Sequence, residues 1–323
     1  MMDFQGKVAV VTGGGSGMGR ELARQLSAVG CHVAMCDVSA DNLADTKTLC
    51  ELDAPAGTRI TTHLCDVADE AQVNRFRDEV VAQHATDHVH LLFNNAGIGG
   101  GGSFLTDSRE SWERTFGICW GGVYLCSRAF VPLVVAASEG HIVNTSSVNG
   151  FWACLGLGNP HTAYSAAKFA VKGFTEALIT DLRLNAPHVR CSVVMPGHIG
   201  TDIALNSQRI HGADPKELTA EQVQMVRDRL AKQGIDASGA SDDDIRLGMQ
   251  AQGEAFRDNA PMTAAEAATV ILDGVRAEKW RILVGDDAHR LDAMVRQIPE
   301  EAYEPSFIDK LRENSVFGFM NDR

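Results

Sequence analysis

The feature that most constrains the fold of this sequence is a regular alternation of short apolar runs with longer amphipathic stretches over its first two hundred residues. Short apolar runs predict strands, and the amphipathic stretches predict helices. Strands are expected at Lys7–Val11, His32–Cys36, Ile60–Cys65, Val89–Phe93, His141–Thr145 and Val189–Val194, with helices at Gly19–Val29, Asn42–Leu52, Glu70–Gln83, Arg109–Ala136 and Tyr164–Leu184. Nearly continuous apolar strands indicate a sheet covered on both faces. The alternation therefore predicts an α/β fold: a single-domain, Rossmann-type, doubly wound parallel sheet with helices on both faces.

The regular alternation stops after Thr201. Residues 202–262 are polar, include the Ser-Asp-Asp-Asp run at 241–244, and predict a helix at Ala220–Lys232. This segment is either a solvated insertion or a lid over the substrate. A capping-box pattern at Thr263–Glu266 predicts a helix that ends near Glu278, followed by a strand at Arg281–Val284. Residues 300–323 are expected to be a C-terminal tail.

Charge and cysteine content exclude several classes of partner. The 323 residues include 29 Lys and Arg against 42 Asp and Glu, a formal net charge of −13, which argues against nucleic acid or an anionic membrane as a partner. The first residues show no secretory signal, and no uncharged apolar run is long enough to span a bilayer. The eight cysteines form no C-x-x-C pair and no metal-ligand spacing, so a reduced, cytoplasmic protein without a metal is expected.

A glycine-rich turn follows the first predicted strand. Thr12-Gly-Gly-Gly-Ser-Gly-Met-Gly19 would let the backbone approach a pyrophosphate placed at the N-terminus of the next helix. Asp37 lies about twenty residues further on, where a carboxylate can accept both ribose hydroxyls and would repel a 2′-phosphate. The alternative is that Asp37 caps a helix, although Ser39 and Asp41 can do so equally well. The pattern predicts a dinucleotide site that prefers NAD(H) to NADP(H).

A second group of residues predicts proton transfer at an alcohol oxygen. Tyr164 and Lys168 are four residues apart on a predicted helix and therefore lie on the same face. A phenol titrates near ~10, and a neighbouring positive charge favours the phenolate. Ser147 precedes them at a strand end and can donate to a developing alkoxide. Ser146 is a rival for the serine position.

With these motifs in this order, the chain resembles a classical short-chain dehydrogenase/reductase over about residues 4–201 and, more loosely, 263–285. The resemblance rests on Thr12–Gly19, Asp66-Val67, Asn94-Asn95-Ala96-Gly97, Ser147, Tyr164 with Lys168, and Pro196-Gly197-x-x-x-Thr201. It implies that Tyr164 is the general acid/base, that Ser147 orients the substrate oxygen, and that Lys168 holds the nicotinamide ribose and lowers the pKa of the tyrosine. The cofactor contacts that the motifs and the resemblance imply are Gly13, Ser16, Gly17, Met18, Gly19, Asp37, Asp66, Val67, Asn94, Ala96, Gly97, Tyr164, Lys168, Pro196, Gly197, Ile199 and Thr201. It also implies a homodimer or homotetramer built on the helices near Arg109–Ala136 and Tyr164–Leu184.

One position departs from the family pattern. The family usually has an asparagine where this chain has Cys119, within Ile118-Cys-Trp-Gly-Gly122. That asparagine is thought to shape the helix so that a main-chain carbonyl holds a water linked to the lysine, and a thiol is a poor hydrogen-bonding substitute. Three interpretations compete: an active enzyme with a modified proton relay, a slowed enzyme, or a cofactor-binding protein without turnover. The first is favoured.

The stretch between Ser147 and Tyr164 bears on the substrate. Phe151–Pro160 is apolar and is expected to flank the reacting carbon, which favours a bulky uncharged alcohol or ketone, such as a cyclic compound. The alternative is that these side chains pack against a neighbouring helix or subunit. Substrate contacts are expected from Ser147, Asn149, Trp152, Tyr164 and His198, although a lone histidine such as His198 is more often exposed. The predicted function is an NAD(H)-dependent interconversion of a secondary alcohol and a ketone; the alternatives are a non-catalytic NAD(H)-binding protein and a lyase or isomerase on the same scaffold.

Overall fold

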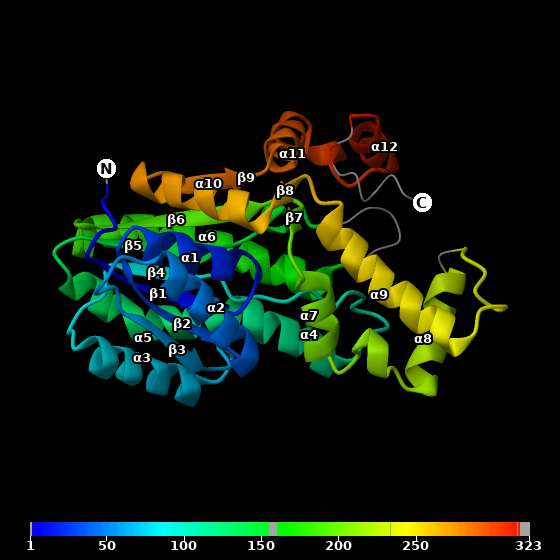
Figure 1. Cartoon of the computed structure of the whole chain (residues 1–323). Helices are drawn as coiled ribbons and strands as arrows, with labels where there is room; N and C mark the ends of the chain where they lie inside the picture. Colours follow the sequence, from blue (N-terminus) through cyan, green and yellow to red (C-terminus); the bar gives the residue numbers. More distant parts are fainter. Residues whose placement is uncertain (1, 155–159, 233, 315, 317–323) are drawn as a thin grey trace.

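The computed structural model describes residues 2–154, 160–232, 234–314 and 316, and it confirms the predicted fold class. A seven-stranded sheet has the order β3-β2-β1-β4-β5-β6-β9, and every neighbouring pair is parallel (Figure 1). Its strands are β1 (Val8–Thr12), β2 (His32–Asp37), β3 (Ile60–Leu64), β4 (Leu91–Asn94), β5 (Gly140–Thr145), β6 (Val189–Pro196) and β9 (Arg281–Val284). The strand order reverses between β1 and β4. In such sheets ligands bind at that reversal, beyond the carboxyl ends of the strands.

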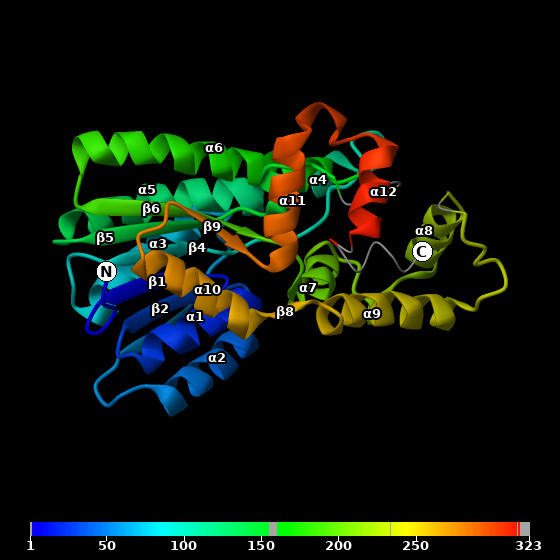
Figure 2. The same cartoon turned by 90° about the horizontal axis from the view of Figure 1, so that it is seen from above.

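Helices cover both faces of the sheet, as Figures 1 and 2 show. One face carries α1 (Gly17–Ala28), α2 (Ala40–Asp53) and α10 (Ala264–Arg276), and the other carries α3 (Glu70–His84), α5 (Gly122–Ala136) and α6 (Thr162–Asn185). Val11 of β1 packs on the α1 side, whereas Val10 packs on the α5 side. This alternation buries both faces of each strand and explains why the strands are apolar throughout.

The helix at 109–136 is continuous but not uniform. It consists of α4 (Arg109–Phe116), the π-helical turn η1 (Gly117–Gly121) and α5. By length and composition alone this helix could cross a membrane, although Arg128 interrupts its apolar run, and half of its apolar window is buried inside the protein. Cys126, Phe130 and Val134 form that buried part against the sheet. Part of its apolarity therefore belongs to the core of the fold.

The segment after β6 forms a separate helical layer at the carboxyl end of the sheet. It contains β7 (Ile199–Gly200), α7 (Ile203–Ile210), η3 (Pro215–Glu217), α8 (Ala220–Lys232), α9 (Asp242–Asp258) and β8 (Met262–Thr263), which pairs with β7. α8 and α9 project away from the sheet (Figure 2). They pack on each other through a small core formed by Leu218, Val223 and Ile245. The polar run at 241–244 is the capping box of α9, in which Ser241 accepts from the backbone N–H of Asp244.

Part of the expected C-terminal tail is folded. α11 (Asp286–Gln297), η4 (Pro299–Glu301) and α12 (Pro305–Glu313) follow β9. Trp152 packs in one cluster with Phe307 of α12, and its indole Nε1–H donates to the carbonyl of Ala302 over 2.7 Å. The alternative that part of the 151–160 stretch packs against a neighbouring helix therefore holds for Trp152. Residues 155–159, 315 and 317–323 lie outside the described residues.

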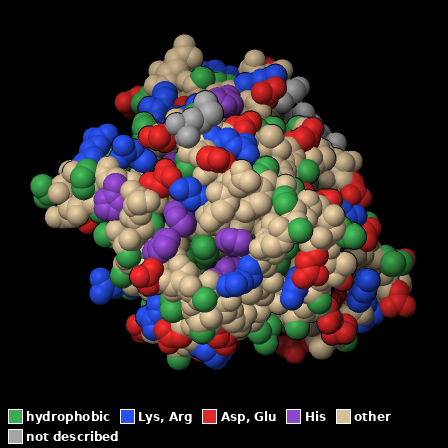
Figure 3. All heavy atoms as spheres, turned by 60° about the vertical axis from the view of Figure 1, so that its left-hand side comes forward, with side chains coloured by type: hydrophobic (Ala, Val, Ile, Leu, Met, Phe, Trp, Pro, Cys, Tyr) green, Lys and Arg blue, Asp and Glu red, His purple; other side chains and the backbone are tan. Residues whose placement is uncertain are grey.

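Histidines gather at the opposite end of the sheet. Figure 3, which brings the amino ends of the strands forward, shows histidine side chains there. Backbone hydrogen bonds hold them: His32 Nδ1 accepts from Arg59 N–H at 2.9 Å, and His90 Nδ1 accepts from Val8 N–H at 3.1 Å. These histidines serve the fold and lie away from the carboxyl end of the sheet.

Candidate active site

Two adjoining cavities lie at the carboxyl end of the sheet. The first, here the glycine-turn cavity, has a volume of about 540 Å³ and is lined by the turn after β1, the end of β2 and α7. The second, here the tyrosine cavity, has a volume of about 470 Å³ and contains Tyr164 and Lys168. Met18, Asn95, Gly97, Thr201 and Ile203 line both, so the two cavities meet.

The glycine-turn cavity has the backbone that a pyrophosphate needs. Gly13 has φ +67°, and a Cβ there would come within 2.9 Å of the Ala96 Cα. A Cβ on Gly19 would lie 2.0 Å from the carbonyl oxygen of Gly13, so the turn packs directly on the start of α1. Ser16, the N-cap of α1, makes no side-chain cap, which leaves the first-turn N–H groups available to an anion. The residues present therefore fit a dinucleotide.

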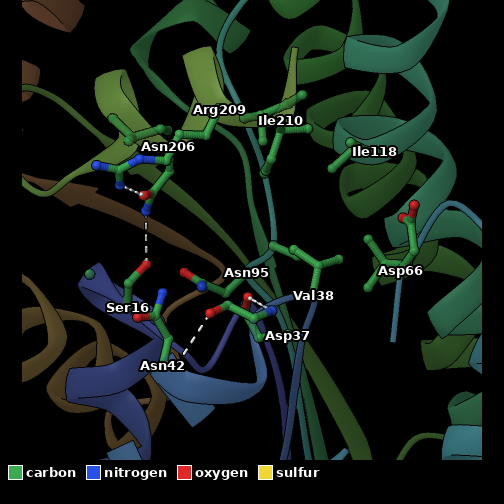
Figure 4. Close-up of a pocket in the computed structure, with 18 of the residues that line it drawn as sticks. Ser16, Asp37, Val38, Asn42, Asp66, Asn95, Ile118, Asn206, Arg209 and Ile210 are labelled. Carbon is green, nitrogen blue, oxygen red and sulfur yellow. Dashed lines mark hydrogen bonds between the residues drawn. The ribbon is translucent and has the colours of Figure 1, made fainter. Parts of the chain in front are cut away.

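Asp37 occupies the position expected for a ribose-binding carboxylate. It lies at the end of β2 and points into the cavity (Figure 4). Its carboxylate accepts from the backbone N–H groups of Gly15 at 3.0 Å and Ser39 at 3.1 Å. Ser39 is the N-cap of α2, with its hydroxyl accepting from Asn42 N–H at 3.3 Å. The alternative that Asp37 caps this helix is therefore wrong.

Most predicted cofactor contacts line one of the two cavities, but two do not. Gly13, Ser16, Gly17, Met18, Asp37, Asp66, Val67, Ala96, Gly97 and Thr201 line the glycine-turn cavity, while Tyr164, Lys168, Pro196, Gly197 and Ile199 line the tyrosine cavity. Gly19 serves as a packing position. Asn94 is buried and its amide donates to Ser127 at 3.1 Å and to Asn144 at 2.8 Å. Asn94 ends β4 and points into the core, whereas Asn95, one residue later, reaches both cavities.

The structure brings Ser147, Tyr164 and Lys168 together in the tyrosine cavity. Ser147 follows β5, its hydroxyl accepts from Asn149 N–H at 3.1 Å, and the same hydroxyl acts to lower the pKa of the Tyr164 phenol. Lys168 Nζ lies 5.3 Å from the Tyr164 ring centroid and donates to the Thr145 carbonyl over 2.9 Å. The rival Ser146 also borders the cavity, but its hydroxyl donates to the Lys168 carbonyl over 2.7 Å and so supports α6.

Burial sets the protonation of this group. Burial raises the pKa of Tyr164 above its ordinary value, Cys119 adds to this electrostatically, and the Ser147 hydrogen bond opposes it. Burial also lowers the pKa of Lys168. Lys168 is not among the causes of this shift, so the expected lowering of the tyrosine pKa by the lysine is not seen and burial dominates. At neutral pH Tyr164 is a phenol, which is the form that can donate a proton.

Comparison with known proteins identifies the family. The family model described as "short chain dehydrogenase" matches residues 7–210. The chain belongs to this family. It is 35% identical over 296 residues to "Putative oxidoreductase SadH" of Mycobacterium tuberculosis, covering 92% of each chain. It is 35% identical over 202 residues to meso-2,3-butanediol dehydrogenase of Serratia marcescens, covering 62% of this chain and 75% of that one.

Solved structures agree. A short-chain dehydrogenase/reductase from Burkholderia phymatum, crystallised in complex with NAD, superposes with a TM-score of 0.74 at 30% identity over 93% of this chain and 95% of that one. A metagenomic short-chain oxidoreductase in complex with NADP has a TM-score of 0.53 at 32% identity, over 60% and 83% of the two chains. The fold and family are thus those of short-chain oxidoreductases.

Cys119, which departs from the pattern that the sequence resembles, is fully buried in η1. Its thiol donates to the Ile98 carbonyl over 3.1 Å and accepts from the Ile98 N–H at 3.4 Å. A Cβ on Gly97 would lie 3.4 Å from Lys168 Nζ and 3.6 Å from Cys119 Sγ, so the thiol borders the lysine. The thiol therefore makes both a donor and an acceptor contact with the backbone after β4, which the sequence argument did not anticipate.

Sequence reasoning missed the contribution of α7 and misjudged His198. One face of α7 lines the tyrosine cavity with Ile203, Ala204, Ser207, Gln208 and the following His211. Their spacing on a helix places them on one side, which is the signal that could have found them. His198 lines the cavity as expected but is 4% exposed, with Nε2 hydrogen-bonded at 2.7 Å to the Phe256 carbonyl of α9. Its expected exposure is therefore wrong.

Proposed function

We propose that this protein is an NAD(H)-dependent oxidoreductase that interconverts a secondary alcohol and a ketone on a bulky, uncharged, apolar or cyclic substrate. One observation carries the proposal. Ser147, Tyr164 and Lys168 share a cavity that opens directly onto a second cavity built from the glycine turn and Asp37. This arrangement supports a reacting carbon placed between a proton donor and a nicotinamide.

The three side chains divide the chemistry. Tyr164, protonated at neutral pH, would donate its proton to the substrate oxygen during ketone reduction and recover it during alcohol oxidation. Ser147 would hold the same oxygen through its hydroxyl hydrogen. Lys168 would stabilise the phenolate left behind, because its Nζ lies close to the tyrosine ring. A bound nicotinamide would supply or accept the hydride.

Charge near Asp37 supports NAD(H) rather than NADP(H). Residues 37–42 that line the glycine-turn cavity include two carboxylates, Asp37 and Asp41, and no cation. A 2′-phosphate would meet uncompensated negative charge there. Arg209 lines the same cavity from α7 (Figure 4), but its guanidinium is paired with Asp214 at 3.1 Å.

The lining of the tyrosine cavity supports an uncharged substrate. Met18, Val148, Trp152, Ile199 and Phe256 supply apolar surface, and Lys168 is the one Lys, Arg, Asp or Glu among the described lining residues. Burial lowers the pKa of His161 to about 4 and also lowers those of His198 and His211, so these rings are neutral at pH 7. The similarity to an enzyme named for a secondary alcohol, meso-2,3-butanediol, points the same way.

The assembly and the lid belong to the same proposal. Residues 202–262 would act as the substrate lid, because α7 borders both cavities. The helix at 109–136 and α6 present aromatic side chains at the surface, including Tyr124 at 47% and Phe169 at 42% exposure. Pairing of such faces between copies would give a homodimer or homotetramer. A cytoplasmic location is proposed because the seven buried cysteines form no disulfide among the described residues.

The test replaces Tyr164 with phenylalanine. Wild-type protein should oxidise NADH when given cyclic ketones, and Tyr164→Phe should lose about 10²–10⁴-fold of that rate while binding NADH with unchanged affinity. Retained activity in Tyr164→Phe would contradict the mechanism. NADH binding without turnover of any ketone or alcohol by the wild type would favour the binding protein. Conversion of a substrate without net change in nicotinamide absorbance would favour a lyase or isomerase.

A further inference from the structure

The roof of the tyrosine cavity contains one polar side chain whose partner is missing. Three polar residues of α7 and its end face this cavity: Ser207, Gln208 and His211. Ser207 is satisfied, because its hydroxyl accepts from Gly99 N–H at 2.7 Å and also bonds the Ile203 carbonyl. His211 Nε2 is also held, at 3.1 Å from the Gly99 carbonyl and 3.2 Å from the Thr115 hydroxyl.

Gln208 differs from both neighbours. Its amide oxygen Oε1 is buried from water and has no hydrogen-bond partner among the described residues. Of the cavity-lining residues, Asn95 also has a buried, unpartnered oxygen, but Asn95 lies on the wall that the two cavities share. Gln208, in contrast, lines only the tyrosine cavity. A buried amide without a partner is destabilising, and such groups require an explanation.

We propose that Gln208 is a specificity-determining residue that binds a second oxygen function of the substrate. This inference rests on the proposed function and narrows its substrate class. The substrate would carry, besides the reacting alcohol or ketone, an uncharged hydroxyl or carbonyl group. Rotation of the terminal amide about its last side-chain bond presents either group to the cavity, so that a hydroxyl can donate to Oε1 and a carbonyl can accept from Nε2. One side chain therefore serves a diol, a hydroxyketone or a diketone.

The surroundings of Gln208 explain why an uncharged group is required. No carboxylate or guanidinium lines the tyrosine cavity in the described residues, and its one lysine, Lys168, is held by the Thr145 carbonyl beside Tyr164, so an ionised second group at Gln208 would lack a counter-charge of its own. The remaining surface near α7 is supplied by Ile203, Ala204 and Ala213, which offer no hydrogen bonds from their side chains. A monofunctional ketone would leave Gln208 unpaired, and that loss is what makes a polar site discriminate.

The test measures this discrimination with matched small ketones. Full-length protein saturated with NADH is given cyclohexanone or its 2-, 3- or 4-hydroxy derivative, and kcat/KM is obtained for each. Gln208→Met keeps the length of the side chain and removes both hydrogen-bonding groups. Gln250→Met is the matched control, because Gln250 also has a buried, unpartnered Oε1 but lies on α9 outside both cavities.

We expect at least one hydroxycyclohexanone to exceed cyclohexanone by about tenfold in kcat/KM with the wild type. That advantage should disappear in Gln208→Met and persist in Gln250→Met. The melting temperature of Gln208→Met should not fall, because the change removes an unsatisfied group. An advantage that survives in Gln208→Met, or a wild type that prefers none of the hydroxyketones, would overturn the inference while leaving the alcohol–ketone function intact. Failure to reduce any ketone, cyclohexanone included, would overturn both.

Discussion

Replacing Asp37 with asparagine is expected to reverse much of the proposed preference for NADH over NADPH. The Asp37 carboxylate is partly exposed to the glycine-turn cavity and accepts two backbone N–H groups, from Gly15 and Ser39. The asparagine oxygen can keep an acceptor contact, so the turn should persist while the negative charge is lost. Two unit charges 4 Å apart interact by about 1 kcal/mol in water and about 4 kcal/mol at an effective dielectric of 20.

A partly exposed site lies between these limits, so about 2 kcal/mol of repulsion should be relieved for NADPH, or roughly 30-fold in Kd. NADH should lose about 1.5 kcal/mol with its charge-assisted hydrogen bond, or roughly tenfold. Nicotinamide fluorescence titrations of wild type and Asp37→Asn measure both values. Asp41→Asn is the control for a general charge effect, because Asp41 lines the same cavity. An unchanged NADH to NADPH ratio, or a wild type that prefers NADPH, would refute the reasoning.

Three further results are expected. Burial raises the pKa of Tyr164, and alcohol oxidation needs its phenolate, so kcat/KM for oxidation should rise with pH. Ketone reduction needs the phenol, so its kcat/KM should stay level through neutral pH. A level oxidation profile from pH 6 to 10 would contradict this. Cys119→Ala should lower the free energy of unfolding by about 2 kcal/mol in urea titrations, because it leaves the Ile98 N–H and carbonyl unpaired. Cys119→Asn can replace both bonds and should keep the stability of the wild type. Activity that appears only in Cys119→Asn would show that the wild type is a cofactor-binding protein without turnover. Trp152→Ala should cost about 3–5 kcal/mol in the same assay, since it removes a buried ring and its bond to Ala302, and a cost below about 1 kcal/mol would show that α12 does not need this contact.

The sheet was predictable because its strands are short, buried on both faces and therefore apolar throughout. The last strand was predicted and found at Arg281–Val284, and the other predicted strands differ by one or two residues at their ends. α9 was missed because its first turn is acidic and polar, although that run is its capping box. α11 and α12 were missed because their stability depends on packing with Trp152, about 150 residues earlier in the chain.

In the site, too, local patterns could be predicted and contacts between distant residues could not. Tyr164 and Lys168 are one turn apart on α6, so local spacing was enough to place them together, whereas Ser147, just after β5, was chosen from the family resemblance. Burial of His198 depends on Phe256, 58 residues away, and no local pattern encodes that contact. Asn94 and Asn95 show the limit of motif reasoning, because a one-residue step at a strand end decides which of them faces the core.

α7 ties the two cavities into one unit. Asn206 donates to the Ser16 hydroxyl at 3.3 Å, beside the turn proposed to hold the pyrophosphate (Figure 4). One residue later, Ser207 accepts from Gly99 N–H, and Gln208 faces the tyrosine cavity. Residues one or two positions apart on α7 therefore line different cavities: Asn206 lines the glycine-turn cavity, and Ser207 and Gln208 line the tyrosine cavity. The residues of the proposed proton chemistry lie on α6 and beside the sheet, which are separate from α7. Changes on the inward face of α7 should consequently alter which ketone is chosen, while the proton transfer by Tyr164 is preserved.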